Sequence, residues 1–520
     1  MTGEMTGEHA DVYIGLDLGT SGLKGVALAA SGTVAARASA AYPTSRPAAG
    51  AAEQAPQDWI TAVETVVGQL RGAVAPQRWR GIGLSGMIPT LVTAAADGEP
   101  AGPAITWQDS RADARGDELR ERCGAGALYR VTGQWVDGRY LLPMFLRLAD
   151  EEPARAAVTA RLLAAKDYLF GWLTGEIATD PSTASGFGCY QLVAGGWHGK
   201  ALAAARSMSG RALPSLPPVL PSTTCRPLRA KAAARLGIGQ VPVCLGAADS
   251  VLGAVGLGVR HPGQVAYIAG TSNVIMGVAD RLLLDPRHRF LVTPLAEPGG
   301  WGLEMDLLAT GSAISWLARL LGDELDEAAL VALAAGTDPR DAPLVLPYLS
   351  PGEQGALWDP AAAGTVVGLE LRHGRRHLAR GLVNGIVMES RRCLAVLDET
   401  GRFGRDLELA GGSAADPGFR ADLADAARRR VRVPGDSDTD CSARGAALAA
   451  RRGVDGTWQP ASPDGELIHD PDQSRAAMWD ELWSRYEQAR HAIARHYHAT
   501  GEAQSGGPAG RAGRCGRGWS

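Results

Sequence analysis

Short apolar runs that end in small or polar residues recur along the chain, and this pattern predicts buried strands joined by turns. The first run, "VYIGLDL", leads into the turn Gly19-Thr20-Ser21-Gly22, after which the chain becomes apolar again. Runs of the same kind predict strands at 12–18, 23–29, 81–85, 90–94, 241–246, near 264–279 and at 407–410.

Apolar residues at helical spacing predict helices between these strands. One helix is expected from 56 to about 75, where Trp59, Val63 and Leu70 share a face. The stretch 103–122 is interpreted as a strand end, a polar loop and an amphipathic helix. The other expected features are helices at 153–174, 306–321, 376–398 and 440–452, a Pro-rich connection at 212–228, and a disordered Gly/Arg-rich end at 505–520.

The chain repeats its opening pattern about half a chain later. "GLDLGTSGLKGVA" at 15–27 has a counterpart in "AYIAGTSNVIMGVA" at 266–279, so that Gly19-Thr20-Ser21 aligns with Gly270-Thr271-Ser272. Two homologous domains that face each other across a cleft would give such a repeat, and chance similarity between hairpin turns is the alternative. The copies differ because Asp17 of the first corresponds to Ile268 of the second.

This difference suits a polyphosphate held between the two turns, with a metal ion on one side only. Glycine lets backbone N–H groups approach a phosphate, successive N–H groups form an anion-binding nest, and hydroxyls add donors. Mg²⁺ prefers one or two carboxylates together with water and substrate phosphates. We therefore expect Asp17 to hold Mg²⁺ beside a phosphate-binding turn. The nearby Lys24 is included among the candidate cofactor-binding residues. A hairpin in which Asp17 caps its own turn is the plain structural alternative.

Length and composition narrow the classes of protein. A chain of 520 residues is too long for one ordinary core, so two domains are expected. The net charge of −4 lacks the basic excess of a nucleic-acid-binding protein. No long apolar run occurs and residues 1–10 are polar, so neither a membrane span nor a signal peptide is expected. The seven scattered cysteines predict free thiols in a reducing compartment.

Two nucleotide-binding patterns are rejected. "GIGLSG" at 81–86 matches GxGxxG, but its glycines lie inside the predicted strand and Pro89 follows instead of a helix. A Walker A loop is missing, because Lys200 is followed by Ala201 and the leading glycine is absent.

Five motifs in a fixed order resemble the FGGY family of carbohydrate kinases, and most closely its xylulokinase branch. They are "IGLDLGTSGLKGV", "ITWQDSR", "LGAADSVLGAVGLG", "AYIAGTSNVIMG" and "LAGGSAADPGFRADLAD", and the similarity covers residues 11 to about 453. The resemblance implies an α/β fold of two actin-like (ribonuclease-H-like) domains with a central cleft. We expect an N-terminal domain at 11–257 for sugar and phosphate, a C-terminal domain at 258–453 for the nucleotide, and a C-terminal extension at 454–520.

The resemblance also assigns roles to residues of this chain. It makes Asp249 of "GAADS" the catalytic base and Asp17 the metal-associated carboxylate. It implies sugar contacts for Met87, Trp107, Asp109 and Arg111. The residues expected to bind ATP are Asp17, Gly19, Thr20, Ser21, Lys24, Gly270, Thr271, Ser272, Gly311, Gly411, Gly412 and Ser413. The implied partners are a sugar, ATP and Mg²⁺ in the cytoplasm, without nucleic acid or membrane, and a homodimer is compatible with the sequence.

Asp249 also has a physical argument of its own. It follows small residues and precedes the apolar run "VLGAVGLGV", so it is expected at a helix N-terminus, where the helix dipole favours a carboxylate. An ordinary N-cap is the alternative. As a base, Asp249 would accept the proton of a sugar hydroxyl that attacks the γ-phosphate in line.

The sequence departs from xylulokinases in the loop after the strand at 81–85. Ile88 and Pro89 replace the His and Gly that are typical there, so the loop expected to contact the sugar loses a polar side chain that could bind a sugar hydroxyl. We expect D-xylulose as the first candidate substrate, and a deoxy analogue to be a better one if this loop touches the sugar. Ribulose, gluconate-like acids and polyols stay open, and a non-catalytic nucleotide-binding protein of the actin-like superfamily is the second class.

Overall fold

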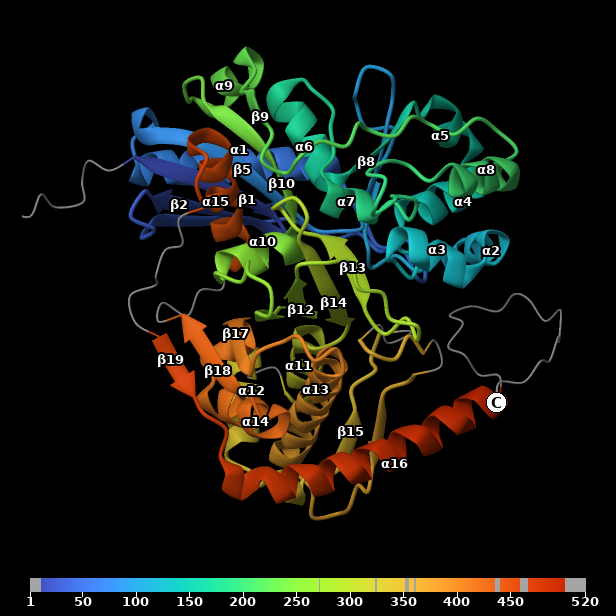
Figure 1. The fold of residues 1–520 in the computed structure, drawn as a ribbon, viewed down its shortest axis with the longest axis vertical. Helices are drawn as coiled ribbons and strands as arrows, with labels where there is room; N and C mark the ends of the chain where they lie inside the picture. The colour runs from blue at the N-terminus through green and yellow to red at the C-terminus, as the bar shows by residue number, and fades with distance from the viewer. Residues whose placement is uncertain are drawn as a thin grey trace, which may run out of the picture.

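Two mixed sheets, one from each half of the chain, form the two parts of the molecule (Figure 1). The computed structural model describes residues 11–270, 272–322, 325–350, 355–359, 362–434, 440–458 and 466–500. The first sheet has the order β3-β2-β1-β5-β10-β9, with bounds Val34–Ala41, Gly22–Ala29, Val12–Leu18, Trp79–Gly86, Pro242–Ala248 and Cys225–Pro227. The second has the order β13-β14-β12-β11-β17-β18-β19, with bounds Leu291–Pro294, Trp301–Leu307, Asn273–Ala279, Val265–Ala269, Asp406–Gly411, Arg430–Pro434 and Glu466–His469.

The two sheets share one topology over five strands. β1 pairs antiparallel with β2 and parallel with β5, just as β11 pairs antiparallel with β12 and parallel with β17. β14 lies beside β12 as β3 lies beside β2, and β18 lies beside β17 as β10 lies beside β5. The predicted repeat is therefore present as two copies of a sheet, each with its small-residue turn between the first two strands.

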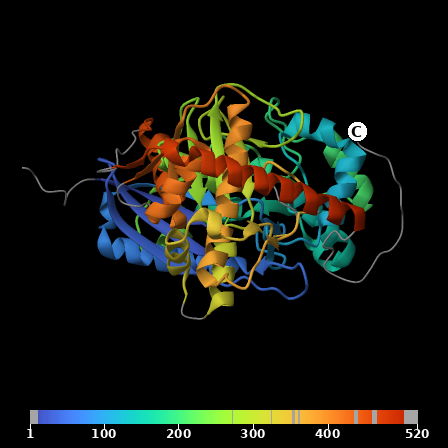
Figure 2. The ribbon, with the colours of Figure 1, turned by 90° about the horizontal axis from the view of Figure 1, so that it is seen from below.

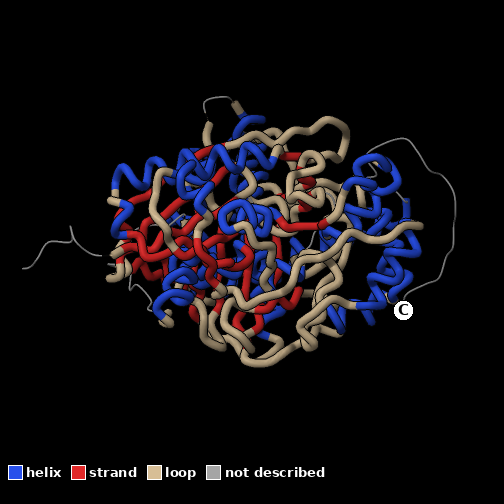
Figure 3. Tube along the Cα trace, turned by 90° about the horizontal axis from the view of Figure 1, so that it is seen from above, coloured by secondary structure: helices blue, strands red, loops and turns tan. Residues whose placement is uncertain are grey.

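Helices cover the sheets and form a separate lobe of the first half. In the first half they are α1 (Pro56–Ala73), α2 (Asp113–Cys123), α3 (Ala125–Thr132), α4 (Leu141–Glu151), α5 (Pro153–Val158), α6 (Ala165–Thr174), α7 (Pro181–Ser185), α8 (Gly199–Ser209), α9 (Ala230–Leu236) and α10 (Asp249–Gly256). Seen from above, the helices of the lobe lie to one side of the strands (Figure 3). Its core is built on α2, α4 and α8, with Phe145 and Leu119 fully buried. The small sheet β4-β7-β6-β8 adjoins this lobe, with bounds Glu53–Gln54, Ala104–Ile105, Leu91–Ala94 and Arg161–Ala164.

The second half has its own helices and one helix that leaves it. Its helices are α11 (Gly311–Leu321), α12 (Glu327–Ala335), α13 (Arg375–Asp398), α14 (Pro417–Ala427), α15 (Cys441–Asp455) and α16 (Ala476–Thr500), and a hairpin joins β15 (Leu344–Leu346) to β16 (Thr365–Val367). α15 packs on β1 and β5 of the first sheet, and on α10 (Figure 1).

Glycines bring α15 close to that sheet. A Cβ at Gly15 or Gly83 would lie 1.8 or 1.9 Å from a carbonyl oxygen of α15, so no larger residue fits. The same is true of Gly445, whose Cβ would lie 1.8 Å from the carbonyl oxygen of Leu252 in α10. Close backbone approach therefore explains why this strand pair and helix pair are rich in glycine.

The C-terminal extension is part of the second half. β19 adds an edge strand beside β18, and α16 runs across the lower face of the molecule (Figure 2). Trp479 of α16 is fully buried, and Arg392 of α13 forms an ion pair with Glu487. The predicted disordered end at 505–520 and Thr271 lie outside the described residues.

Two predicted helices are wrong in part. The stretch 153–174 holds α5, the strand β8 and then α6, because Leu162 and Leu163 are buried in pairing with β6. The stretch 306–321 begins with the end of β14, and α11 starts only at Gly311. In both places a short apolar run fits the period of a helix as well as that of a strand, and pairing with the neighbouring strand determines which of the two forms.

The expectation of free thiols is wrong for one pair of cysteines. The antiparallel register of β9 and β10 places Cys225 opposite Cys244, and the two form a disulfide. The sequence spacing could not reveal this pairing because the strands meet only in the folded sheet. Cys123 and Cys189 are buried and keep their thiols. None of the helices in the described part of the chain is long and apolar enough to cross a membrane.

Candidate active site

The first turn places a buried carboxylate between two strands. Asp17 lies near the end of β1, directly beside Ser85 of β5, and its Oδ1 accepts a 2.6 Å hydrogen bond from the Ser85 hydroxyl. Burial raises the pKa of Asp17 above its usual value, and the Ser85 hydrogen bond and the charge of Lys24 offset part of this rise. The turn itself closes through a 3.1 Å hydrogen bond from the Gly19 N–H to the Gly22 carbonyl.

Two side chains that the sequence analysis did not select bind this turn. Gln54 of β4 donates to the Thr20 carbonyl at 2.7 Å, and its own carbonyl accepts from the Trp59 ring N–H at 2.9 Å. The Tyr42 hydroxyl donates to the carbonyl of Gly19. These residues are far from the turn in sequence, so no local pattern marks them.

The second turn is supported by neutral groups. Asn273, which follows the turn, is fully buried and donates to the Tyr267 hydroxyl at 2.6 Å. Its carbonyl oxygen accepts from the Thr310 hydroxyl at 2.7 Å. Because Thr310 precedes α11, this contact brings Gly311 beside the second turn.

Gly411 belongs to the same cluster. The β11–β17 register pairs Gly411 with Ala269, and a Cβ at Gly411 would lie 2.0 Å from the Ala269 carbonyl oxygen. Its φ of 109° also favours glycine. Gly412 and Ser413 follow in a single 3-10 turn, and a Cβ at Gly412 would meet no atom within 4 Å. The structure thus gathers the predicted nucleotide-binding residues of the second half, Thr271 apart, at one end of β11, β12 and β17.

Asp249 is the first residue of α10 and lines a cavity between the two halves. Burial, followed by the charges of Asp17 and Glu304, raises its pKa well above the ordinary value of 3.8. The helix N-terminus was expected to favour the charged form, but the loss of water and two nearby carboxylates outweigh it. A carboxyl group with a raised pKa in a cavity is a candidate proton acceptor.

The cavity is lined by residues from both halves. Thr20 of the first turn and Ser272 of the second are on its wall. Its polar lining also includes Gln134, Arg139, Tyr140, Thr293, Glu304 and Asp306, and its apolar lining includes Ile88, Pro89, Trp107, Val274, Leu291 and Leu308. The loop that departs from xylulokinases therefore does reach the cavity.

Glu304 is a cavity residue that the sequence analysis missed. It lies on β14, is buried, and accepts a 2.6 Å hydrogen bond from the Thr293 hydroxyl. Burial raises its pKa. An acidic residue inside the apolar strand "WGLEMDL" is unusual, so the sequence carried a signal for Glu304. That Glu304 shares a cavity with Asp249 depends on how the two halves meet.

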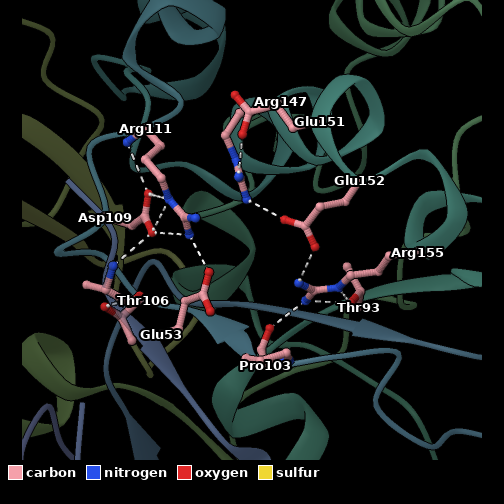
Figure 4. A network of polar contacts seen from close by, with 11 residues as sticks. Glu53, Thr93, Pro103, Thr106, Asp109, Arg111, Arg147, Glu151, Glu152 and Arg155 are labelled. Carbon is pink, nitrogen blue, oxygen red and sulfur yellow. Dashed lines mark hydrogen bonds and ion pairs between the residues drawn. The ribbon is translucent and has the colours of Figure 1, made fainter. Parts of the chain in front are cut away.

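Of the four additional predicted sugar contacts, Trp107 alone lines this cavity. Its ring N–H donates to the Thr20 hydroxyl at 3.0 Å. The Arg111 guanidinium is instead bound to Asp109 and Glu53, with Nη2–oxygen distances of 2.6 and 2.5 Å (Figure 4). Asp109 also accepts the Ala52 N–H at 2.9 Å, so this ion-pair cluster fixes the loop that carries Trp107.

Met87 is buried outside the cavity lining, and Lys24 lies at the interface of the two halves. The Lys24 ammonium is 3.1 Å from a carboxylate oxygen of Asp440, and the Arg37 guanidinium is 3.5 Å from the other oxygen. Asp440 immediately precedes α15, so this ion pair joins β2 and β3 to the second half.

The residues present fit a shared Mg²⁺ better than a cage made by protein alone. Within the described ranges, no three His, Cys, Asp or Glu side chains converge as metal ligands. Asp17 is buried and Asp249 is half-buried, and the charge of Asp17 raises the pKa of Asp249. A divalent cation bound mainly by phosphates and water would relieve this repulsion and needs only one or two carboxylates.

Two family models together match most of the chain. The model for the N-terminal domain of the FGGY family of carbohydrate kinases matches residues 12–256, and the model for its C-terminal domain matches residues 265–453. The chain belongs to the FGGY family of carbohydrate kinases. This FGGY kinase is therefore a phosphotransferase that uses ATP to phosphorylate a sugar.

Individual relatives of this FGGY kinase agree on the reaction but differ in sugar. Xylulose kinase of Escherichia coli (strain K12) is 30% identical over 415 residues, which cover 80% of this chain and 84% of that protein. Gluconokinase of Bacillus subtilis (strain 168) is 26% identical and covers 82% of this chain and 85% of that protein. The crystal structure of xylulose kinase from Rhodospirillum rubrum is 29% identical, with a TM-score of 0.80 over 94% of this chain and 100% of that one. The expected two-domain actin-like α/β fold is confirmed.

Proposed function

We propose that this kinase phosphorylates an uncharged polyhydroxy sugar, with D-xylulose as the first candidate, and that Asp249 is its general base. The observation that carries the proposal is the position of Asp249, which lines a cavity that has one turn of each half on its wall. A sugar hydroxyl bound there could give its proton to Asp249 while its oxygen attacks the γ-phosphate of an ATP held between the turns and ADP leaves.

The roles of the other residues follow from their contacts. The backbone of the turn at Gly19–Gly22, with Thr20 and Ser21, would bind phosphate oxygens from one side, and the turn at Gly270–Ser272 would bind them from the other. Gly311, Gly411, Gly412 and Ser413 would pack against the nucleoside. Mg²⁺ would neutralise phosphate charge when bound near Asp17. Lys24 is assigned to the contact between the halves, and Asp109 and Arg111 to positioning of Trp107.

The lining supports a neutral sugar over a sugar acid. Asp249, Glu304 and Asp306 all line the cavity, and its arginine, Arg139, is already bound to Asp137 with an Nη2–Oδ2 distance of 2.5 Å. A carboxylate substrate would meet acidic groups and find this guanidinium engaged. Glu304 and Thr293 could instead bind substrate hydroxyls, for which the family likeness to xylulose kinases gives the first guess.

The test is ATP consumption over a panel of D-xylulose, 1-deoxy-D-xylulose, D-ribulose, L-ribulose and D-gluconate, with a control without sugar. We expect neutral ketopentoses to exceed D-gluconate in kcat/KM. Because Ile88 and Pro89 line the cavity, we also expect 1-deoxy-D-xylulose to match or exceed D-xylulose. Preference for D-gluconate would overturn the neutral-sugar proposal. Nucleotide binding without sugar-dependent ADP formation would favour a non-catalytic protein.

A cytoplasmic location and a homodimer belong to the same proposal. ATP is available in the cytoplasm, whereas the Cys225–Cys244 disulfide is more typical of an oxidising compartment. A thiol count on protein alkylated at the moment of cell lysis tests the location, and light scattering at several protein concentrations tests the dimer.

A further inference from the structure

The strand that leads to Asp249 is irregular at its end. Pairing between β10 and β5 shifts register between Cys244 and Ala247. Gly246 has a φ of 69°, and a Cβ there would lie 1.6 Å from the Leu84 carbonyl oxygen. Such a bulge leaves neighbouring backbone groups without their ladder partners, and buried groups of this kind need other partners.

A buried lysine binds one of these groups. Lys166, which is 1% exposed, lies in the first turn of α6 and donates from Nζ to the Leu245 carbonyl at 3.1 Å. Carboxylate oxygens of Asp167 and Asp180 each lie 3.2 Å from the same Nζ. Lys166 thus connects the bulge to a fully buried ion pair.

Asp180 is linked through Ser182 to Ala248, the residue before Asp249. Its Oδ2 accepts hydrogen bonds from the Ser182 hydroxyl at 2.5 Å and from the Ser182 N–H at 3.0 Å. A hydroxyl has one proton, so with that proton directed at Asp180 its lone pairs face elsewhere. The Ser182 oxygen accepts the N–H of Ala248 at 2.9 Å.

We infer that Lys166, Asp180 and Ser182 form a positioning network that sets the direction in which Asp249 enters the cavity. The network binds a backbone group on each side of Gly246, namely the Leu245 carbonyl and the Ala248 N–H. None of the three side chains lines the cavity, so they act through the backbone and not on the sugar. The inference rests on the proposed role of Asp249.

Two serines provide a matched test. Ser182 and Ser222 are both buried, and both hydroxyls donate to Oδ2 of Asp180, at 2.5 and 3.2 Å. The Ser182 oxygen also accepts the Ala248 N–H, and the structure records no such contact for the Ser222 hydroxyl. Ser182→Ala and Ser222→Ala therefore remove the same kind of group from the same carboxylate. Lys166 is a poor choice, because removing a buried cation leaves two buried carboxylates uncompensated.

The measurements are kcat, KM for ATP and ADP affinity by calorimetry. We expect Ser182→Ala to lower kcat by at least about tenfold, because small displacements of a reacting group are costly. KM for ATP and ADP affinity should stay within about twofold, as expected when only the reactive step is affected. Ser222→Ala should stay within about twofold of wild type in all three quantities.

Equal kcat values for Ser182→Ala and Ser222→Ala would overturn the network, and so would an equal loss of ADP affinity and kcat in Ser182→Ala. Ser182→Cys, which keeps an acceptor atom, is expected to retain more activity than Ser182→Ala, and Ser182→Gly, which lacks the acceptor, replaces the alanine variant if that variant is insoluble. Asp249→Ala is measured beside them. An active Asp249→Ala enzyme contradicts the proposed base, whereas an inactive one beside a fully active Ser182→Ala contradicts the network alone.

Discussion

The two repeats have the same strand order and the same kind of turn, but one is charged and the other is neutral. In the first, Asp17 faces Lys24 across the β1–β2 ladder and binds Ser85. In the second, Ile268 faces Val274 at the equivalent place, and amide and hydroxyl groups support the turn. One scaffold therefore provides two small-residue turns, and of the two strands that lead into them only the first, β1, carries a carboxylate.

A second difference concerns the two aspartates at the N-terminal ends of α10 and α15. Asp249 begins α10 after β10 and lines the cavity, whereas Asp440 precedes α15 after β18 and pairs with Lys24 and Arg37. Similar positions thus carry the proposed base in one repeat and an ion pair between the halves in the other. The comparison indicates that the repeated fold determines the positions of these side chains, and that the groups around each side chain determine its role.

Replacing Asp249 is the strongest test of this division of roles. Asp249→Ala should lower kcat by about 10²–10⁴-fold, the range for loss of a general base, while ADP affinity is kept. Asp440→Ala, the matched change in the other repeat, should affect kcat much less, because Asp440 acts at the interface of the halves. Steady-state kinetics and calorimetry on both variants check this, and equal losses would contradict the asymmetry.

Asp17→Asn tests the charged turn. The change keeps size and removes charge, so we expect the rate at limiting Mg²⁺ to fall by about 10–100-fold, with a higher Mg²⁺ midpoint and little change in stability. Ile268→Val at the equivalent place should leave the Mg²⁺ titration unchanged. An Asp17→Asn titration that overlays wild type would remove Asp17 from the metal site.

Gly83→Ala tests the close packing of α15 on the first sheet. Gly83 lies under α15, whereas the same place in the second sheet is Glu408. The added Cβ would meet the Ala446 carbonyl oxygen at 1.9 Å, and we expect a loss of about 1–3 kcal/mol in the free energy of unfolding. Gly68→Ala in α1 is the control, since no atom lies within 4 Å of its Cβ. Denaturant titrations of both would show whether the glycine is required.

Glu408 gives the smallest effect, with a definite sign in pH. Burial raises the pKa of Glu408 to about 7, so the folded state holds its proton more tightly than the unfolded chain, where the value is 4.5. Its charge therefore costs stability as pH rises from 4.5 toward 7, and the full cost is present above that range. Glu408→Gln should raise the free energy of unfolding by less than about 1 kcal/mol at pH 8 and leave it unchanged near pH 4. A gain at low pH only would reverse this interpretation.

The sequence predicted what repeats and motifs encode locally. It placed the turns at Gly19 and Gly270, the two-part α/β organisation, and Asp249 at the start of a helix, because each depends on a few neighbouring residues. It did not reveal Ser85, Gln54 or Glu304, which reach the site from distant strands. It did not reveal that the Arg111 guanidinium pairs with Asp109 and Glu53, and the predicted sugar contact of Arg111 stays a prediction. The missing information is tertiary pairing, which one sequence does not contain.

The crossing of α15 has a consequence for biosynthesis. The first sheet is finished in sequence at Ala248, yet the helix that covers β1 and β5 ends only at Asp455. A ribosome must therefore make nearly the whole chain before that face of the sheet can be shielded from water. Until then the nascent chain exposes glycine-rich strands with no cover, which is the kind of surface that chaperones bind and that aggregates. The two halves of this kinase have separate sheets, but the first sheet is fully covered only after the second half has been synthesised.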